Sequence, residues 1–185
     1  MPRKILNEVF GYKEFRIGQL EVIEALLENT HTLAVMPTGS GKSVCFQIPA
    51  LIKGGLTIVV SPLVALMEDQ ISALKLLGIE AETINSSKER ENNIVAWNRV
   101  VEGHVRLLYL SPERLMSERM IKALVKQPVS LIAIDEAHLV SRWGPSFRPD
   151  YEELTKLRDV FLDVPIVALT ATADKSTQED IIKKA

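Results

Sequence analysis

The 185-residue sequence lacks the features that mark secreted and membrane proteins. Its single cysteine, Cys45, excludes an internal disulfide and is typical of a reducing compartment. No apolar run approaches the ~20 residues of a membrane-spanning helix, and the N-terminus has no hydrophobic stretch of the kind found in signal peptides. These absences predict an intracellular protein with no membrane partner, cytoplasmic in a bacterium or nuclear in a eukaryote.

The sequence also lacks an excess of either charge. It has 22 Lys and Arg against 24 Asp and Glu, a net charge of −2, which excludes a histone-like protein but not a local basic groove. Internal repeats, low-complexity tracts and linkers are missing as well, and this length suits a single domain. A domain of this size buries roughly 70% of its unfolded surface, enough for a substantial core.

Short β-branched apolar runs alternate along the chain with longer amphipathic segments. This alternation predicts an α/β fold with a mostly parallel sheet flanked by helices on both faces. The predicted strands are residues 32–36, 57–61, 81–84, 106–110, 131–135 and 165–170. The predicted helices are residues 18–28, 41–51, 63–77, 88–102, 117–126 and 151–160. The final residues, DIIKKA, fall within a further predicted helix, so we expect the chain to be part of a longer protein.

A glycine-rich segment, MPTGSGKS, connects the first predicted strand to a predicted helix. In a P-loop, glycines let backbone N–H groups surround phosphate oxygens, and the following helix N-terminus adds its positive dipole. Lys42 would then reach the β- and γ-phosphates, and the Ser43 hydroxyl would bind Mg²⁺. Met36 departs from the general pattern by occupying the first glycine position, and the alternative is a glycine-rich turn with a chance lysine. The predicted nucleotide-binding residues here are Pro37, Thr38, Gly39, Ser40, Gly41, Lys42 and Ser43.

The tetrapeptide DEAH follows the predicted strand 131–135. A carboxylate at the end of a parallel strand beside a P-loop is the second half of a nucleoside triphosphatase site, so Asp135 would hold Mg²⁺ through water. Glu136 would position and polarise the attacking water, and His138 would hydrogen-bond a later motif. Alone, these residues could be an acidic helix start. Together with Lys42 they predict hydrolysis of a nucleoside triphosphate.

Six ordered segments resemble the motifs of RecQ-family helicases in superfamily two. They are VFGYKEFRIGQ (motif 0), MPTGSGKS (motif I, with methionine at the departing position), VSPLVALMEDQ (Ia), YLSPERL (Ib), DEAH (II) and ALTATA (III). The resemblance covers nearly the whole chain and implies that residues 1–185 form the first RecA-like, ATP-binding domain. A second RecA-like domain, absent from this chain, would supply an arginine finger.

The resemblance assigns roles that the residue types alone leave open. Motif 0 would recognise adenine, with Tyr12 flanking the base and Arg16 and Gln19 contacting it, although Gln19 alone predicts only a surface helix residue. Thr170 and Thr172 of motif III would relay between the ATP site and bound DNA, although they could equally be a strand end and a cap.

Two Ser-Pro pairs are candidates for contacting DNA. Ser61-Pro62 and Ser111-Pro112 each follow a predicted strand and are expected to open a helix, whose N-terminus can present N–H groups to a phosphate. The alternative is plain helix capping. Arg114, in the second pair's motif, is a further predicted DNA contact.

The segment SRWGPSFRPDY resembles the aromatic-rich loop of the family, which couples single-stranded DNA to ATP hydrolysis. Trp143 and Phe147 offer faces for base stacking, worth ~1–3 kcal/mol per base, and Arg148 adds charge or a cation–π contact. The alternative is that these aromatics cover the domain surface. Pro145 and Ser146 replace the His-Asp pair of the family pattern, so that pair's polar link to the ATP site is not implied here.

The combined hypothesis is an ATP- and Mg²⁺-dependent motor domain of a DNA helicase that acts on single-stranded or forked DNA. Two alternatives stay open: the ATPase core of an RNA helicase or duplex translocase, and a nucleotide-gated binding module without catalysis. We expect the isolated chain to hydrolyse ATP slowly and not to unwind DNA, because the second RecA-like domain is missing.

Overall fold

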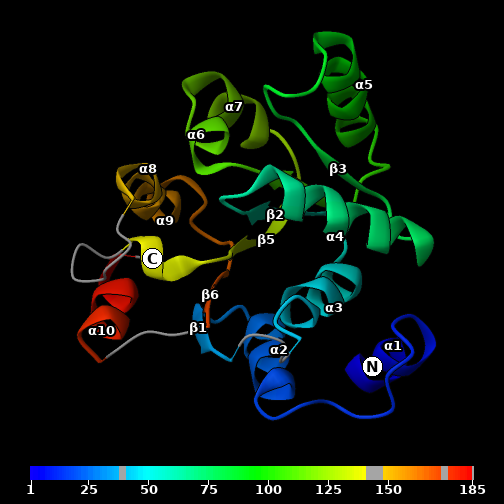
Figure 1. The fold of residues 1–185 in the computed structure, drawn as a ribbon, viewed down its shortest axis with the longest axis vertical. Helices are drawn as coiled ribbons and strands as arrows, with labels where there is room; N and C mark the ends of the chain where they lie inside the picture. The colour runs from blue at the N-terminus through cyan, green and yellow to red at the C-terminus, as the bar shows by residue number, and fades with distance from the viewer. Residues whose placement is uncertain (38–40, 141–147, 172–174, 185) are drawn as a thin grey trace.

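A computed structural model describes residues 1–37, 41–140, 148–171 and 175–184. Its centre is one six-stranded sheet in the order β1-β6-β5-β2-β4-β3, and every described strand pair is parallel (Figure 1). All six predicted strands are present, with ends that differ by up to two residues. The strands are β1 (Thr32–Val35), β2 (Leu56–Val60), β3 (Ala81–Thr83), β4 (Leu107–Leu110), β5 (Val129–Ile134) and β6 (Ile166–Thr170).

Helices connect the strands. Five of the predicted helices are confirmed as α2 (Gln19–Leu27), α3 (Val44–Lys53), α4 (Val64–Leu76), α5 (Arg90–Val101) and α7 (Glu118–Leu124). The helix expected at the end of the sequence is α10 (Lys175–Lys184). The helix expected to open at Ser111-Pro112 is the short α6 (Pro112–Leu115). The sequence pattern did not predict α1 (Pro2–Glu8) or the 3₁₀ helix η1 (Ala137–Val140).

The single helix predicted for residues 151–160 is wrong. The chain there forms three short pieces, α8 (Pro149–Glu152), the 3₁₀ helix η2 (Glu153–Lys156) and α9 (Leu157–Val160). Tyr151, Leu154 and Leu157 are all buried. Residues that recur strictly every three positions stay on one side of a 3₁₀ helix, but they rotate progressively around an α-helix, which has 3.6 residues per turn. Burying all three side chains on one side therefore favours the tighter 3₁₀ turn of η2.

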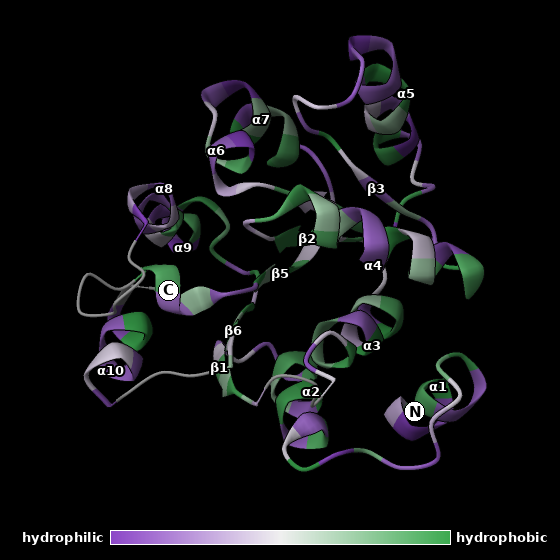
Figure 2. Cartoon of the chain, in the orientation of Figure 1, coloured by the Kyte–Doolittle hydropathy of each residue, from purple (hydrophilic) through white to green (hydrophobic). Residues whose placement is uncertain are grey.

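Alternate residues of each central strand enter two different cores. On β2, Ile58 and Val60 pack into one cluster and Val59 into the other. The first cluster is covered by α5 to α10 and the second by α2, α3 and α4. Figure 2 shows these helices changing from hydrophobic to hydrophilic around their axes. Burial on both faces explains why the strands are apolar at consecutive positions.

The N-terminal helix α1 forms a smaller third cluster with α2 and α3, in which Leu6, Ile23 and Ile48 are buried. The backbone N–H of Tyr12 donates to the Leu6 carbonyl at 3.1 Å. The segment between α1 and α2 is thereby fixed beside α3.

Hydrogen bonds join the residues that follow the strands along the carboxyl edge of the sheet. The Met36 N–H donates to the Thr170 carbonyl at 2.9 Å, and the Asp135 N–H donates to the Val60 carbonyl at 2.9 Å. The carboxyl ends of β1 and β6, and of β5 and β2, therefore present their following residues at one edge. None of the helices within the described residues combines the length and apolarity needed to cross a membrane.

Candidate nucleotide-binding site

The described part of the glycine-rich segment leads into a rigid helix. Ser43 occupies the N-cap of α3, and the Cys45 N–H donates to the Lys42 carbonyl at 3.1 Å, which closes a tight turn. Residues 44–50 of α3 are all buried, so the base of this turn is fixed in the core. Lys42 and Ser43 thus lie between β1 and a helix N-terminus, where a P-loop requires them. Thr38, Gly39 and Ser40 lie outside the described residues.

Gln19 connects the motif 0 segment to the glycine-rich turn. Its side chain is 4% exposed, so the alternative of an ordinary surface helix residue is wrong. The Nε2 group donates to the Gly41 carbonyl at 3.0 Å, and Oε1 accepts from the Arg16 N–H at 2.8 Å. Gly41 has φ +76°, and a Cβ there would lie 2.6 Å from Gln19 Nε2. The left-handed backbone favours glycine at this position, and a Cβ there would displace the end of the Gln19 side chain.

A hollow lies beside this turn. Residues 15–18 line it from one side and Val35, Met36 and Pro37 from the other, so it brings Arg16 and Pro37 together. Tyr12 is 54% exposed and does not line the hollow. Met36 is buried, and a Cβ on Gly18 would lie 3.2 Å from its Cε. The Met36 side chain thus packs against α2.

The DEAH segment turns sharply after β5. Glu136 has φ +54°, an unusual left-handed conformation for a residue other than glycine. Its Oε1 lies 3.9 Å from Lys42 Nζ, and its Oε2 lies 3.6 Å from His138 Nδ1. His138 Nδ1 also shares a 2.8 Å hydrogen bond with Thr170 Oγ1. The predicted hydrogen bond between His138 and a later motif is confirmed.

Thr170 is completely buried at the end of β6, so its hydroxyl contacts protein and not solvent. One line of contacts runs from the turn after β1 through Glu136 and His138 to β6. The predicted partner in motif III, Thr172, lies outside the described residues.

Asp135 has the environment of a carboxylate that needs a cation. Burial raises the pKa of Asp135, while the nearby Lys42 lowers it and Glu136 raises it further. The Glu136 N–H donates to Asp135 Oδ1 at 2.9 Å. Within the described residues there is no cluster of three or more His, Cys, Asp and Glu that could hold a metal. One carboxylate and one hydroxyl, Asp135 and Ser43, nevertheless fit Mg²⁺, which usually binds few protein ligands together with substrate phosphates.

Tyr151 is a site residue to which the sequence assigned no role. Its phenol is completely buried, and the hydroxyl donates to the Asp135 carbonyl at 3.0 Å. The Arg148 guanidinium lies 5.7 Å from the centre of the Tyr151 ring and forms an ion pair with Asp150 at 2.6 Å. Arg148, a predicted DNA contact, is therefore linked through Tyr151 to Asp135. The sequence did not predict this link, because Pro145 and Ser146 replace the His-Asp pair of the family pattern.

Trp143 and Phe147, with Pro145 and Ser146 between them, lie outside the described residues.

The two Ser-Pro pairs differ. Ser111 Oγ accepts from the Arg114 N–H at 3.2 Å, so Ser111 caps α6 as expected. The prediction that Ser61-Pro62 opens a helix is wrong, because Leu63 is extended and α4 begins at Val64. Ser61 is only 3% exposed, and its N–H donates to the Leu110 carbonyl at 3.2 Å, which ties β2 to β4.

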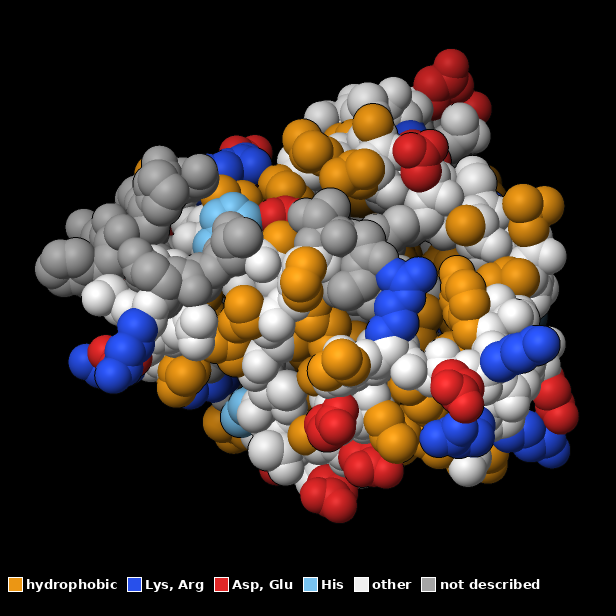
Figure 3. Space-filling view, turned by 60° about the horizontal axis from the view of Figure 1, so that its bottom comes forward, with side chains coloured by type: hydrophobic (Ala, Val, Ile, Leu, Met, Phe, Trp, Pro, Cys, Tyr) orange, Lys and Arg blue, Asp and Glu red, His pale blue; other side chains and the backbone are white. Residues whose placement is uncertain are grey.

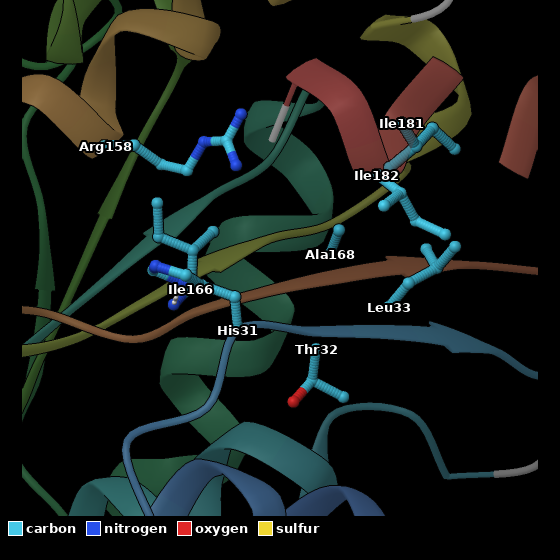
Figure 4. A pocket seen from close by; sticks show the side chains of 8 residues that line it. All are labelled: His31, Thr32, Leu33, Arg158, Ile166, Ala168, Ile181 and Ile182. Carbon is cyan, nitrogen blue, oxygen red and sulfur yellow. Dashed lines mark hydrogen bonds between the residues drawn. The ribbon is translucent and has the colours of Figure 1, made fainter. Parts of the chain in front are cut away.

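A second hollow lies at the opposite end of β1 and β6. It is lined by His31, Thr32, Leu33, Arg158, Ile166, Ala168, Ile181 and Ile182 (Figure 4). Its polar groups are already engaged: His31 Nδ1 accepts from the Ile166 N–H at 3.0 Å, and Arg158 donates to the Lys183 carbonyl. No carboxylate lines this hollow within the described residues, and it lies at the amino ends of β1 and β6, away from the carboxyl ends, so it does not resemble a nucleotide site.

The surface agrees with the near-neutral net charge. On the face shown in Figure 3, basic and acidic side chains lie in small separate groups among hydrophobic ones. Any anion-binding surface on this face must therefore be local.

Comparison with known proteins identifies relatives of the whole chain. Residues 16–181 match the model of the DEAD/DEAH box helicase family. The chain is 50% identical to an ATP-dependent DNA helicase RecQ of Haemophilus influenzae over 97% of its own length and 29% of that protein. It is 45% identical to an ATP-dependent DNA helicase RecQ of Bacillus subtilis over 98% of its length and 31% of that protein. The chain thus spans less than a third of these relatives.

Solved structures share the fold at low sequence identity. The crystal structure of the DUF1998 helicase MrfA bound to DNA and AMPPNP aligns with a TM-score of 0.74 at 19% identity, over 99% of this chain and 28% of that one. The parallel sheet with helices on both faces is therefore the RecA-like arrangement that the motifs predicted.

Proposed function

Because the chain belongs to the DEAD/DEAH box helicase family, we propose that it is the ATP-hydrolysing motor domain of a RecQ-type DNA helicase. The observation that carries this proposal is the line of contacts from Lys42 through Glu136 and His138 to Thr170. It joins three separate motifs at the edge of the sheet where nucleotides bind in open α/β folds.

The charges of the site suggest how ATP enters it. Lys42 and Glu136 compensate each other at 3.9 Å. The triphosphate offers Lys42 a stronger anionic partner, and the exchange leaves the Glu136 carboxylate free to orient a water molecule. That water attacks the γ-phosphate in line, and positioning and electrostatics carry most of the catalysis. His138 holds Glu136 relative to Thr170.

Mg²⁺ bound to the nucleotide would be held by Asp135 and Ser43. It supplies neutralisation of the phosphate charge that builds up during the reaction. The Asp135 carboxylate is destabilised by burial, so a nearby cation favours its charged form.

We further propose that Arg16 and Gln19 bind the adenine beside the hollow at residues 15–18, with Tyr12 flanking the base. This part of the proposal is supported by the Gln19 hydrogen bonds to both neighbouring segments.

DNA and a second RecA-like domain are the proposed partners. The relatives named as DNA helicases are about three times as long as this chain, which leaves room for such a domain. Arg148 and Ser111 are proposed DNA contacts, together with Trp143 and Phe147. The arginine finger would come from the second domain, so the present chain alone would turn over slowly.

The test is the activation of ATP hydrolysis in the full-length protein. We expect oligo-deoxythymidylate to raise the turnover number and oligo-uridylate of equal length to do so far less. Equal or greater activation by RNA would transfer the proposal to an RNA helicase. The 185-residue chain, assayed alongside, should show weak hydrolysis and no unwinding.

A further inference from the structure

A basic groove lies away from the nucleotide site, between α5 and the helices α6 and α7. It has a volume of about 540 Å³, and Figure 1 shows α6 and α7 beside each other with α5 across from them, at the top of the view. Four cationic side chains line it, and none of its lining residues is acidic. These are Lys88, Arg90, Arg114 and Arg119.

Three arginines elsewhere on the described chain, Arg99, Arg148 and Arg158, are compensated by acids or carbonyls, but those of the groove are not. Arg99, also on α5, forms ion pairs with Glu80 and Glu82. Across residues 1–37, 41–140, 148–171 and 175–184, no ion pair involves Arg90, Arg114 or Arg119. Lys88 is the exception among the four, because its ammonium lies 4.0 Å from the Glu82 carboxylate. The three arginines are like charges without counter-charges, so they repel one another, and a bound anion relieves that repulsion.

The groove also has the apolar component that single-stranded nucleic acid requires. Trp97 of α5 and Met120 of α7 line it, together with Ile84, the residue that follows β3. Trp97 is half-buried against the core, so its indole is held in a fixed position. Basic side chains for the phosphates and an aromatic surface for a base are the two elements of sequence-independent single-strand binding.

Its position extends a contact already proposed. Arg114 belongs both to the groove and to the Ser111-capped helix α6 at the carboxyl edge. Ser117, the N-cap of α7, also lines the groove. A strand that contacts Ser111 can therefore continue directly between α5 and α7.

We propose that this groove binds the phosphate backbone of single-stranded DNA beyond the Ser111 contact, with Arg90 and Arg119 neutralising phosphates and Trp97 supporting a base. The inference rests on the proposed function only in naming DNA as the ligand. The groove's own residues favour a single-stranded polyanion whatever its identity. Arginine suits this role because its planar guanidinium can contact two phosphate oxygens at once.

The experiment uses the full-length protein without nucleotide and fluorescein-labelled oligo-deoxythymidylates of increasing length, with affinity measured by anisotropy at several salt concentrations. In the double variant Arg90→Gln/Arg119→Gln, we expect roughly tenfold weaker binding and a salt slope lower by about 0.7 for each lost phosphate contact. Arg90→Lys/Arg119→Lys should retain the salt slope. The control Arg3→Gln/Lys126→Gln removes the same charge from exposed residues outside the groove and should bind as the unmodified protein does.

Basal ATP hydrolysis separates this inference from the proposed function. If the unmodified protein hydrolyses ATP and binds DNA, but the glutamine variant has unchanged affinity and salt slope, the groove proposal alone is overturned. If the unmodified protein does not hydrolyse ATP, the proposed function fails. The binding data of the variants still decide whether the groove binds single-stranded DNA. If fluorescein-labelled poly-glutamate binds the unmodified protein and only its affinity, not that of oligo-deoxythymidylate, falls in the glutamine variant, the groove binds an acidic protein segment and the proposal is overturned.

Discussion

Charged side chains are paired at one end of the sheet's carboxyl edge, and the described arginines of the groove are unpaired at the other. Above β1, β5 and β6, Glu136 lies within 4 Å of both Lys42 and His138, so positive and negative groups are already matched. Beyond β3 and β4, Arg90 and Arg119 have no acidic partner among the described residues. A matched cluster must exchange partners when a ligand arrives, whereas an unmatched groove needs only to receive an anion.

This difference suits one region to catalysis and the other to binding a polyanion. Partner exchange is useful where a reaction must wait for its substrate, because Glu136 is released only when phosphate takes Lys42. Unmatched charge gives affinity that depends on salt and little on sequence. Substitutions at the two ends should therefore have distinct consequences, and three variants test the nucleotide end.

The largest effect is expected for Glu136→Gln. Loss of the base should lower the turnover number by roughly 10²–10⁴-fold. ATP should still bind, because Lys42 no longer has to leave an acidic partner. Turnover of the full-length protein and ATP affinity, measured separately, would show this split. Glu102→Gln makes the same isosteric change at an exposed side chain after α5 and should leave both unchanged. Unchanged turnover in Glu136→Gln would refute the assignment of hydrolysis to this site.

A smaller effect is expected for Gly41→Ala. The left-handed backbone at φ +76° costs an L-residue roughly 1–2 kcal/mol, and the new Cβ would displace the Gln19 amide. The expected loss of ATP affinity is about 5–30-fold, the factor that corresponds to one or two kcal/mol. Affinity for single-stranded DNA in the absence of nucleotide should not change.

Gly103→Ala is the matched control. Gly103 has φ +82°, but a Cβ there would meet no atom within 4 Å. This variant carries the same backbone strain away from the site, so it should lose stability and keep its ATP affinity. Equal losses of ATP affinity in both variants would mean that strain alone, and not the Gln19 contact, controls the nucleotide end.

The sequence predicted the sheet well because the strands are buried on both faces. Residues of β2 such as Ile58 and Val59 face different cores, so the apolar run is continuous and its ends are marked by polar or glycine residues. The helix predicted for residues 151–160 failed because its buried residues recur every third position, which a search for α-periodicity does not separate from a helix.

The candidate site was predictable where its chemistry is local in the sequence. Lys42 and Glu136 belong to contiguous motifs that follow strands, and parallel strands bring such ends together. Gln19 and Tyr151 act through contacts with residues 22 and 16 positions away, and these contacts exist only in the folded chain. Only the resemblance gave Gln19 a role, and nothing in the sequence assigned one to Tyr151.

The smallest effect is expected for Tyr151→Phe, which tests whether the nucleotide site depends on the hydrogen bond from Tyr151 to the Asp135 carbonyl. The change removes the hydroxyl that donates to the Asp135 carbonyl and leaves that buried acceptor without this partner. The free energy of unfolding should fall by about 1–3 kcal/mol. Because Asp135 precedes the left-handed Glu136, turnover should also fall a few-fold, while the KM for ATP changes little.

Tyr109→Phe distinguishes a tether from general destabilisation. Tyr109 is as deeply buried as Tyr151, but its hydroxyl hydrogen-bonds Gln70 of α4 at 2.8 Å and Gln47 of α3. Within the described residues it lies near Asp135 without a hydrogen bond to the DEAH turn, so this variant tests the contact itself and not the distance from the site. It should lose similar stability and keep its turnover number. If both variants lose turnover in proportion to stability, the contact between Tyr151 and Asp135 is only structural. If only Tyr151→Phe loses turnover while both variants lose similar stability, the geometry of Asp135 and Glu136 depends on the segment that begins at Arg148, next to the aromatic-rich loop.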